Sequence, residues 1–198
     1  MLLSEYLPTN CSTAGLFGLS KQIADTLMAS LPAGKVTDIT PHVVIAGATT
    51  LPYLQSAAAN ALIAAINEKG TPPRLVHALR VLPQQYAVFY WFTHGKKCGV
   101  VLAAAPSASP HERAIAIDIQ NHSEWIPVLK KHNWIWRGAA DPPHFNFHGG
   151  SDPDLGREGI RAFQKLWNQH NPTDPLSEDG NYGPKTQKKL EASPIEGF

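Results

Sequence analysis

Two histidines and two aspartates are spaced in this sequence in a way that suits a catalytic metal. His111 precedes Asp118 by seven residues, and Asp141 precedes His144 by three. Two imidazoles and one carboxylate, with a fourth position left open, form a typical catalytic zinc site. A second carboxylate that is not a ligand can take the proton of an attacking water. The sequence therefore predicts a single Zn²⁺ ion on His111, Asp118 and His144, with Asp141 as general base.

The local pattern around Asp118 is that of a strand able to present this ligand. Residues 114–119 alternate strictly, which places Ile115, Ile117 and Ile119 on a buried face. Asp118 then lies on the opposite face beside the small Ala116, which leaves room for a metal and a substrate. We expect His111 to reach the site from the preceding loop.

The second pair of candidate residues flanks two prolines. A helix is disfavoured between Asp141 and His144, and a polyproline-like conformation with three residues per turn would put both side chains on one side. His148 follows His144 by four residues and is a rival ligand, but the strand pattern favours His144.

Around these residues, the sequence predicts helices first and a group of short strands afterwards. Apolar periodicity indicates helices over 20–31 (capped by Ser20), 53–69, 84–94 and 123–131. Short β-like runs cover 99–105, 114–119, 134–137 and 145–148. This order predicts an α+β fold rather than alternating βαβ units.

Three ordered motifs resemble one enzyme family. Residues 109–118, SPHERAIAID, resemble the S-x-H-x-x-G-x-A-x-D motif of VanY-type zinc D-alanyl-D-alanine carboxypeptidases and of the L-alanyl-D-glutamate endopeptidases of phage lysins. DPPHF resembles their second motif, in which an acidic residue stands three places before the last histidine. HALRVLPQQY resembles their upstream Y-R-S-x-x-x-Q element, with Arg80 and Gln85 at the matching positions. The resemblance covers about 51–149.

This resemblance implies the fold shared by these DD-peptidases and the Hedgehog signalling domain, a small, mainly antiparallel sheet backed by helices. It implies that Arg80 holds the substrate carboxylate or the developing oxyanion. Gln85 and Ser109 become candidate substrate-binding residues, and Ser109 can alternatively fix its loop. Departures from the family pattern include Ala114 for the motif glycine, Leu79 for tyrosine, and Asp141 where many carboxypeptidases have glutamate.

The composition changes after Gly149, where GGSDPDLG is typical of a linker. The following segment resembles part of a three-helix peptidoglycan-binding module, with an FQ helix and a D-G-x-Y-G-x-x-T turn. The matching residues, predicted to bind cell wall, are Phe163, Gln164, Asp179, Gly180, Tyr182 and Gly183, together with Thr186. We expect a partial or rearranged module that either binds wall or completes the core. The predicted division is an N-terminal helical extension over 1–50, a zinc peptidase domain over 51–149 and a small helical C-terminal segment over 150–198.

Composition and charge narrow the partners and the compartment. A net charge of +1 among 198 residues favours neither nucleic acid nor an anionic membrane. The first nineteen residues lack a basic start and an unbroken apolar run, so no signal peptide is recognisable. We expect a monomer without membrane insertion, made in the cytoplasm and acting in the periplasm or wall after lysis or dedicated secretion. The two cysteines, Cys11 and Cys98, can form one bridge or remain thiols.

The expected function is hydrolysis of a peptidoglycan stem peptide by a zinc D-alanyl-D-alanine carboxypeptidase. A close alternative is an endopeptidase, either an endolysin or a secreted antibacterial effector, that cuts L-alanyl-D-glutamate or a cross-link; Asp141 matches those enzymes better. A third alternative is a non-catalytic wall-binding module with a structural zinc.

Overall fold

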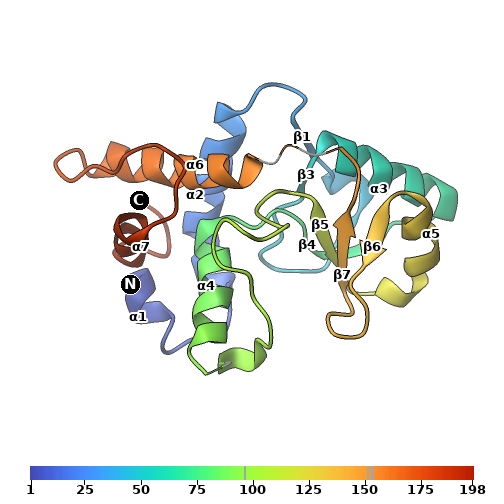
Figure 1. Ribbon diagram of the computed structural model, residues 1–198, viewed down its shortest axis with the longest axis horizontal. Helices are drawn as coiled ribbons and strands as arrows, with labels where there is room; N and C mark the ends of the chain where they lie inside the picture. Colours follow the sequence, from blue (N-terminus) through green and yellow to red (C-terminus); the bar gives the residue numbers. More distant parts are fainter. Residues whose placement is uncertain (96, 151, 153) are drawn as a thin grey trace. The chain divides into compact units, whose positions relative to one another are not determined.

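The computed structural model describes residues 1–95, 97–150, 152 and 154–198, and it has the predicted α+β composition (Figure 1). Ser151 and Pro153 of the predicted linker lie outside these described residues. The chain forms two compact units, each assembled from segments that are distant in the sequence. The first unit comprises 1–30, 81–112 and 154–198, and the second comprises 31–80 and 113–153.

The second unit is built on a mixed five-stranded sheet. Its strands, in spatial order, are β2 (Val44–Ile45), β4 (Arg74–His77), β5 (Ala116–Ile119), β7 (His144–Phe147) and β6 (Trp134–Trp136). The pairings are antiparallel except for the parallel contact of β2 with β4, so the expectation of a mainly antiparallel sheet is confirmed. A separate two-stranded sheet joins β1 (Val36–Asp38) to β3 (Tyr53–Gln55).

Two helices supply the apolar layer on which the large sheet rests. The alanine-rich α3 (Ser56–Lys69) buries Ala58, Leu62 and Ala65, and α5 (Ile126–Lys131) buries Val128 and Leu129. These side chains pack in one cluster with the alternating isoleucines of 115–119 and with Trp125 and Trp134. The short helices η2 (Thr40–His42) and η4 (His122–Glu124) complete the unit. The predicted inward face of β5 is therefore confirmed.

The first unit is helical and combines both ends of the chain. Its elements are α1 (Leu3–Tyr6), η1 (Ala14–Leu16), α2 (Phe17–Ser30), α4 (Leu82–Thr93), η3 (Lys97–Gly99), α6 (Leu155–His170) and α7 (Pro184–Glu191). Helix α2 packs along α6, and α4 also contacts α6. A disulfide between Cys11 and Cys98 joins the segment before η1 to η3. The C-terminal segment thus packs into this helical unit through α6.

Several element boundaries differ from the sequence prediction. Helix α2 begins at Phe17, and Ser20, predicted to cap it, is buried within it and donates its hydroxyl to the carbonyl of Leu16 at 2.7 Å. The first residues of the helix predicted over 53–69 form β3, because they pair with β1.

The strand predicted over 99–105 is wrong. After η3 this stretch is irregular, and Val101 and Leu102 are 65% and 52% exposed. A local apolar run becomes a strand only when a partner strand satisfies its backbone groups, and no pairing with residues 99–105 occurs within the described part of the chain. Conversely, β1, β2 and β4 were not predicted, since two to four residues are too few to show a periodic pattern.

The length and the hydropathy of the helices decide whether any of them could cross a lipid bilayer. Among the described residues, none has both the length and the apolar character that a membrane-crossing helix requires.

Candidate metal site

The two adjacent strands β5 and β7 position two of the predicted ligands. Asp118 in β5 lies directly opposite His144 in β7 in the antiparallel register. Directly paired residues in such a sheet have side chains on the same face, within contact distance of each other. The chain segment that leads into β5 carries His111.

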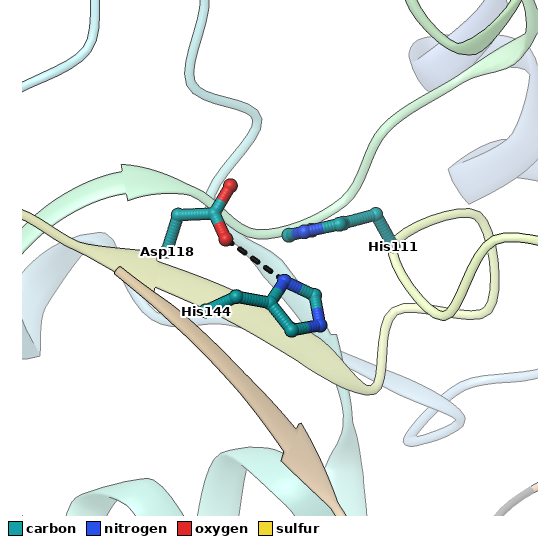
Figure 2. Close-up of side chains that lie close together, drawn as sticks. All are labelled: His111, Asp118 and His144. Carbon is teal, nitrogen blue, oxygen red and sulfur yellow. Dashed lines mark hydrogen bonds and ion pairs between the residues drawn. The ribbon is translucent and has the colours of Figure 1, made fainter. Parts of the chain in front are cut away.

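The three predicted ligands form one buried cluster. One ligand atom from each of His111, Asp118 and His144 lies within 4.8 Å of the other two, and all three residues are buried. Figure 2 shows the side chains turned toward one another, with Asp118 Oδ1 3.0 Å from His144 Nδ1. Buried polar groups that converge in this way need a shared partner or a hydrogen-bond network, and a metal ion satisfies that need.

Hydrogen bonds within the loop preceding β5 determine where His111 lies. The Ser109 hydroxyl accepts the backbone N–H of His111 at 3.3 Å. The buried Glu112 carboxylate accepts the backbone N–H groups of Ser107 and Ser109, at 3.0 and 3.2 Å. Ser109 therefore fixes this loop in the structure, which is one of the two roles expected of it.

Ala114 stands at the position of the motif glycine and has the conformation for which glycine is suited. Its φ is +52°, in the left-handed region, and its side chain is fully buried. The backbone on both sides is held by Gln55, whose N–H donates to the Ala114 carbonyl at 2.9 Å and whose side-chain amide donates to the Arg113 carbonyl at 2.7 Å. The turn between His111 and β5 thus requires a left-handed residue even though alanine replaces glycine.

The donor set fits a divalent transition metal. Two imidazoles and one carboxylate suit zinc and neighbouring first-row metals, whereas calcium and magnesium prefer sites made of oxygen alone. The cluster therefore has the donors and the burial of a metal site, and these donors do not by themselves select one transition metal.

Two side chains, those of His77 and Arg80, lie close to Asp118 Oδ2, the carboxylate oxygen that does not contact His144. His77 Nδ1 is 3.2 Å from Asp118 Oδ2, and the Arg80 guanidinium is 3.8 Å from the same oxygen. The Arg80 side chain is largely buried, with 15% exposed. Arg80 thus lies beside a predicted ligand and not in an exposed surface pair. Because the Arg80 side chain is largely buried, solvent screens its charge less than it would at the surface.

Asp141 lies in the turn that enters β7, and this turn is not polyproline-like. The His144 N–H donates to the Asp141 carbonyl at 3.1 Å, a local hydrogen bond that a polyproline helix does not form. The Asp141 side chain is 38% exposed and lies 3.9 Å from the guanidinium of Arg137. Among the described residues, the group of possible ligands includes neither Asp141 nor the exposed His148.

Gln85, the remaining motif residue, is buried in α4. Its side-chain amide donates to the Ala104 carbonyl at 2.7 Å and so holds the irregular stretch that follows η3. This contact uses an amide proton that would otherwise be available to a substrate.

The C-terminal residues that resemble a wall-binding module form an interior network. Phe163 is fully buried, and Gln164 donates to Asp179 Oδ1 at 3.0 Å and accepts the Gly180 N–H at 2.8 Å. The N–H of Asn181, and then the Gln164 amide, lower the pKa of Asp179. Phe163 and Gln164 thus shape this segment from within.

Tyr182 and Gly183 of the predicted set lie nearer the surface, whereas Thr186 is buried. Tyr182 is partly exposed, and Gly183 precedes α7. A hollow of about 460 Å³ lies between α6 and the start of α7, lined in part by Leu176, Asn181 and Lys185.

Comparison with protein-family models, with curated proteins and with solved structures found no match. The class that the fold and site define is therefore an α+β protein with a buried His-Asp-His cluster able to bind a metal ion.

Two side chains beside the cluster were missed by sequence reasoning. Neither His77, whose Nδ1 lies 3.2 Å from Asp118 Oδ2, nor Asn146, whose Oδ1 lies 2.9 Å from His144 Nε2, is among the predicted site residues. For Asn146 the sequence does offer a signal. It lies two residues after His144 in a strand, and residues two apart share a face of the sheet.

Proposed function

We propose that this protein is a zinc metallopeptidase that hydrolyses peptidoglycan stem peptides, of the D-alanyl-D-alanine carboxypeptidase type. One observation carries the proposal. His111 and Asp118 of one motif and His144 of another converge in one buried cluster. Convergence of residues up to thirty-three positions apart in the chain is expected of a site and not of a chance spacing.

The proposed chemistry divides among the residues around the cluster. When bound, zinc would lower the pKa of water and polarise a carbonyl group. Asp141, held in the turn before His144, would accept the proton of the attacking water and pass it to the leaving amine. The Arg80 guanidinium beside Asp118 would stabilise the negative charge of the substrate carboxylate or oxyanion.

Different parts of the chain would carry catalysis and wall binding. Residues 51–149 would carry catalysis and 150–198 would contribute wall binding, through the exposed turn around Tyr182 rather than through the buried Phe163. The protein would act as a monomer in the periplasm or cell wall. The Cys11–Cys98 disulfide supports an oxidising compartment, where such bonds persist.

An endopeptidase that cuts L-alanyl-D-glutamate or a cross-link is the second candidate, favoured by aspartate rather than glutamate at position 141. Digestion of defined muropeptides separates the two. Loss of one terminal D-alanine identifies the carboxypeptidase, whereas release of a larger peptide identifies the endopeptidase.

The decisive experiment compares Asp141→Asn with Asp118→Asn. Asp141→Asn should retain one zinc per chain while kcat falls by roughly 10²- to 10⁴-fold, because only basicity is removed. Asp118→Asn should lose zinc, and Asp25→Asn, at an exposed position on α2, should match the native protein.

Three results would contradict the proposal. If Asp141→Asn loses zinc while Asp118→Asn retains it, Asp141 is the metal ligand and Asp118 is not. Full activity of verified metal-free protein would refute the metal mechanism. A native protein that binds zinc but leaves sacculi and muropeptides intact would identify a non-catalytic module with a structural metal.

A further inference from the structure

The strands that carry the metal ligands also carry a continuous chain of side-chain contacts. Asn146 Oδ1 lies 2.9 Å from His144 Nε2, and His144 Nδ1 lies 3.0 Å from Asp118 Oδ1. On the far side, Asp118 Oδ2 lies 3.2 Å from His77 Nδ1. The order is therefore Asn146, His144, Asp118 and His77, and neither of the two outer residues is at a matched position of a motif.

The register of the sheet produces this order. His144 and Asn146 are two residues apart in β7 and so share a face, while His144 is paired directly with Asp118 of β5. Asp118 is in turn paired with His77 of β4, beyond an irregularity in the register after Leu75. Three neighbouring strands thus hold the four side chains in a row.

The chemistry of the end residues determines the state of the two ligands between them. An amide oxygen can only accept a hydrogen bond, so Asn146 favours the His144 tautomer with the proton on Nε2. In that tautomer the lone pair is on Nδ1, where it faces Asp118 Oδ1. Two acceptors facing each other are stabilised by a cation that both can bind. His77, which donates from Nδ1 to Oδ2, holds the carboxylate so that Oδ1 keeps this direction.

We propose that Asn146 and His77 are positioning residues for the metal: Asn146 makes Nδ1 the ligand atom of His144, and His77 orients the Asp118 carboxylate. The proposal rests on the metal binding in the proposed function and deepens it. Hydrogen-bond partners of this kind fix the tautomer and orientation of metal ligands, and their loss typically weakens metal binding by about 10- to 100-fold.

Zinc affinity measured by competition with a chromophoric chelator tests the positioning roles. Asn146→Ala and His77→Ala should each bind zinc about 10- to 100-fold more weakly than the native protein. Asn146→Asp retains an acceptor oxygen and should bind at least as tightly as native. His77→Asn retains a donor near the Nδ1 position and should lie within about threefold of native. Ile135→Thr, at the exposed cross-strand neighbour of Asn146, controls for disturbance of the sheet and should leave affinity unchanged.

A second measurement reads the tautomer directly. Imidazole nitrogen shifts of the zinc-loaded native protein should show His144 protonated at Nε2 and bound through Nδ1. Unchanged affinity in both alanine variants would overturn the proposal, as would a zinc-loaded His144 protonated at Nδ1. Conservative variants as weak as the alanine variants would indicate simple packing and overturn it too.

These outcomes are distinct from failure of the proposed function. If zinc binds the native protein and requires His111, while the alanine variants bind normally, only the positioning proposal fails. If the native protein and a His111→Ala variant bind zinc equally weakly, the metal site itself is wrong, and both proposals fall together.

Discussion

Replacing Phe163 by alanine would separate a structural role of the C-terminal segment from a wall-binding role. Phe163 lies in α6, fully buried, in the unit where α6 packs along α2. Truncating a buried phenylalanine removes its burial and leaves a cavity, and such changes cost about 3–5 kcal/mol. In a chain of this size each 1 kcal/mol lowers Tm by roughly 2–4 °C. We therefore expect Phe163→Ala to lower Tm by about 6–20 °C.

Thermal and urea unfolding of the purified protein would measure this change, and Gln169→Ala is the matched control. Gln169 lies on the same helix but is exposed, so its replacement should alter stability by no more than about 0.5 kcal/mol. Binding to sacculi would be measured on both variants below their unfolding transitions. A Phe163→Ala protein of native stability that no longer binds sacculi would refute the reasoning, because it would make this buried ring part of the binding surface.

Three further predictions concern the same helical unit. Replacing both cysteines by serine should cost about 3–5 kcal/mol in urea unfolding, since the disulfide closes a loop across 87 positions; an unchanged midpoint would show that the bond does not form. Gly18→Ala should destabilise by more than about 2 kcal/mol, because a Cβ there would overlap the carbonyl oxygen of Glu196, whereas Gly159→Ala, where the space is open, should stabilise by about 0.5–1 kcal/mol. Equal effects of the two glycine changes in thermal unfolding would contradict the close approach. Burial, and then the neighbouring Glu191, raise the pKa of Tyr86, so its contribution to stability is present below about pH 10 and is lost as the pH rises further. The free energy of unfolding should therefore decline between pH 8 and 11, and Tyr86→Phe should reduce that decline. An identical decline in the variant would exclude this tyrosine as the cause.

Much of the metal site could be predicted from local sequence because its pattern is local. The alternation of 114–119 placed the isoleucines inward and Asp118 on the other face, and the structure has that arrangement. The spacing of His111, Asp118 and His144 within recognisable motifs singled out three ligands that the structure brings together. The long helices were also predictable, since fourteen residues of α3 show a periodicity that the four residues of β4 cannot show.

The surroundings of the ligands depended on contacts between distant parts of the chain. His77 meets Asp118 only because β4 pairs with β5 across 41 positions, and no local pattern encodes that register. The apolar pattern at 99–105 is typical of a strand, but this stretch is irregular because no partner strand pairs with it in the described part of the chain. The local sequence predicts a separate C-terminal segment after a linker. In the structure the apolar face of α6 is buried, because α2 packs along it. Sequence alone determined which side chains are candidate metal ligands, whereas strand register and helix packing, which depend on the whole chain, decided what surrounds them.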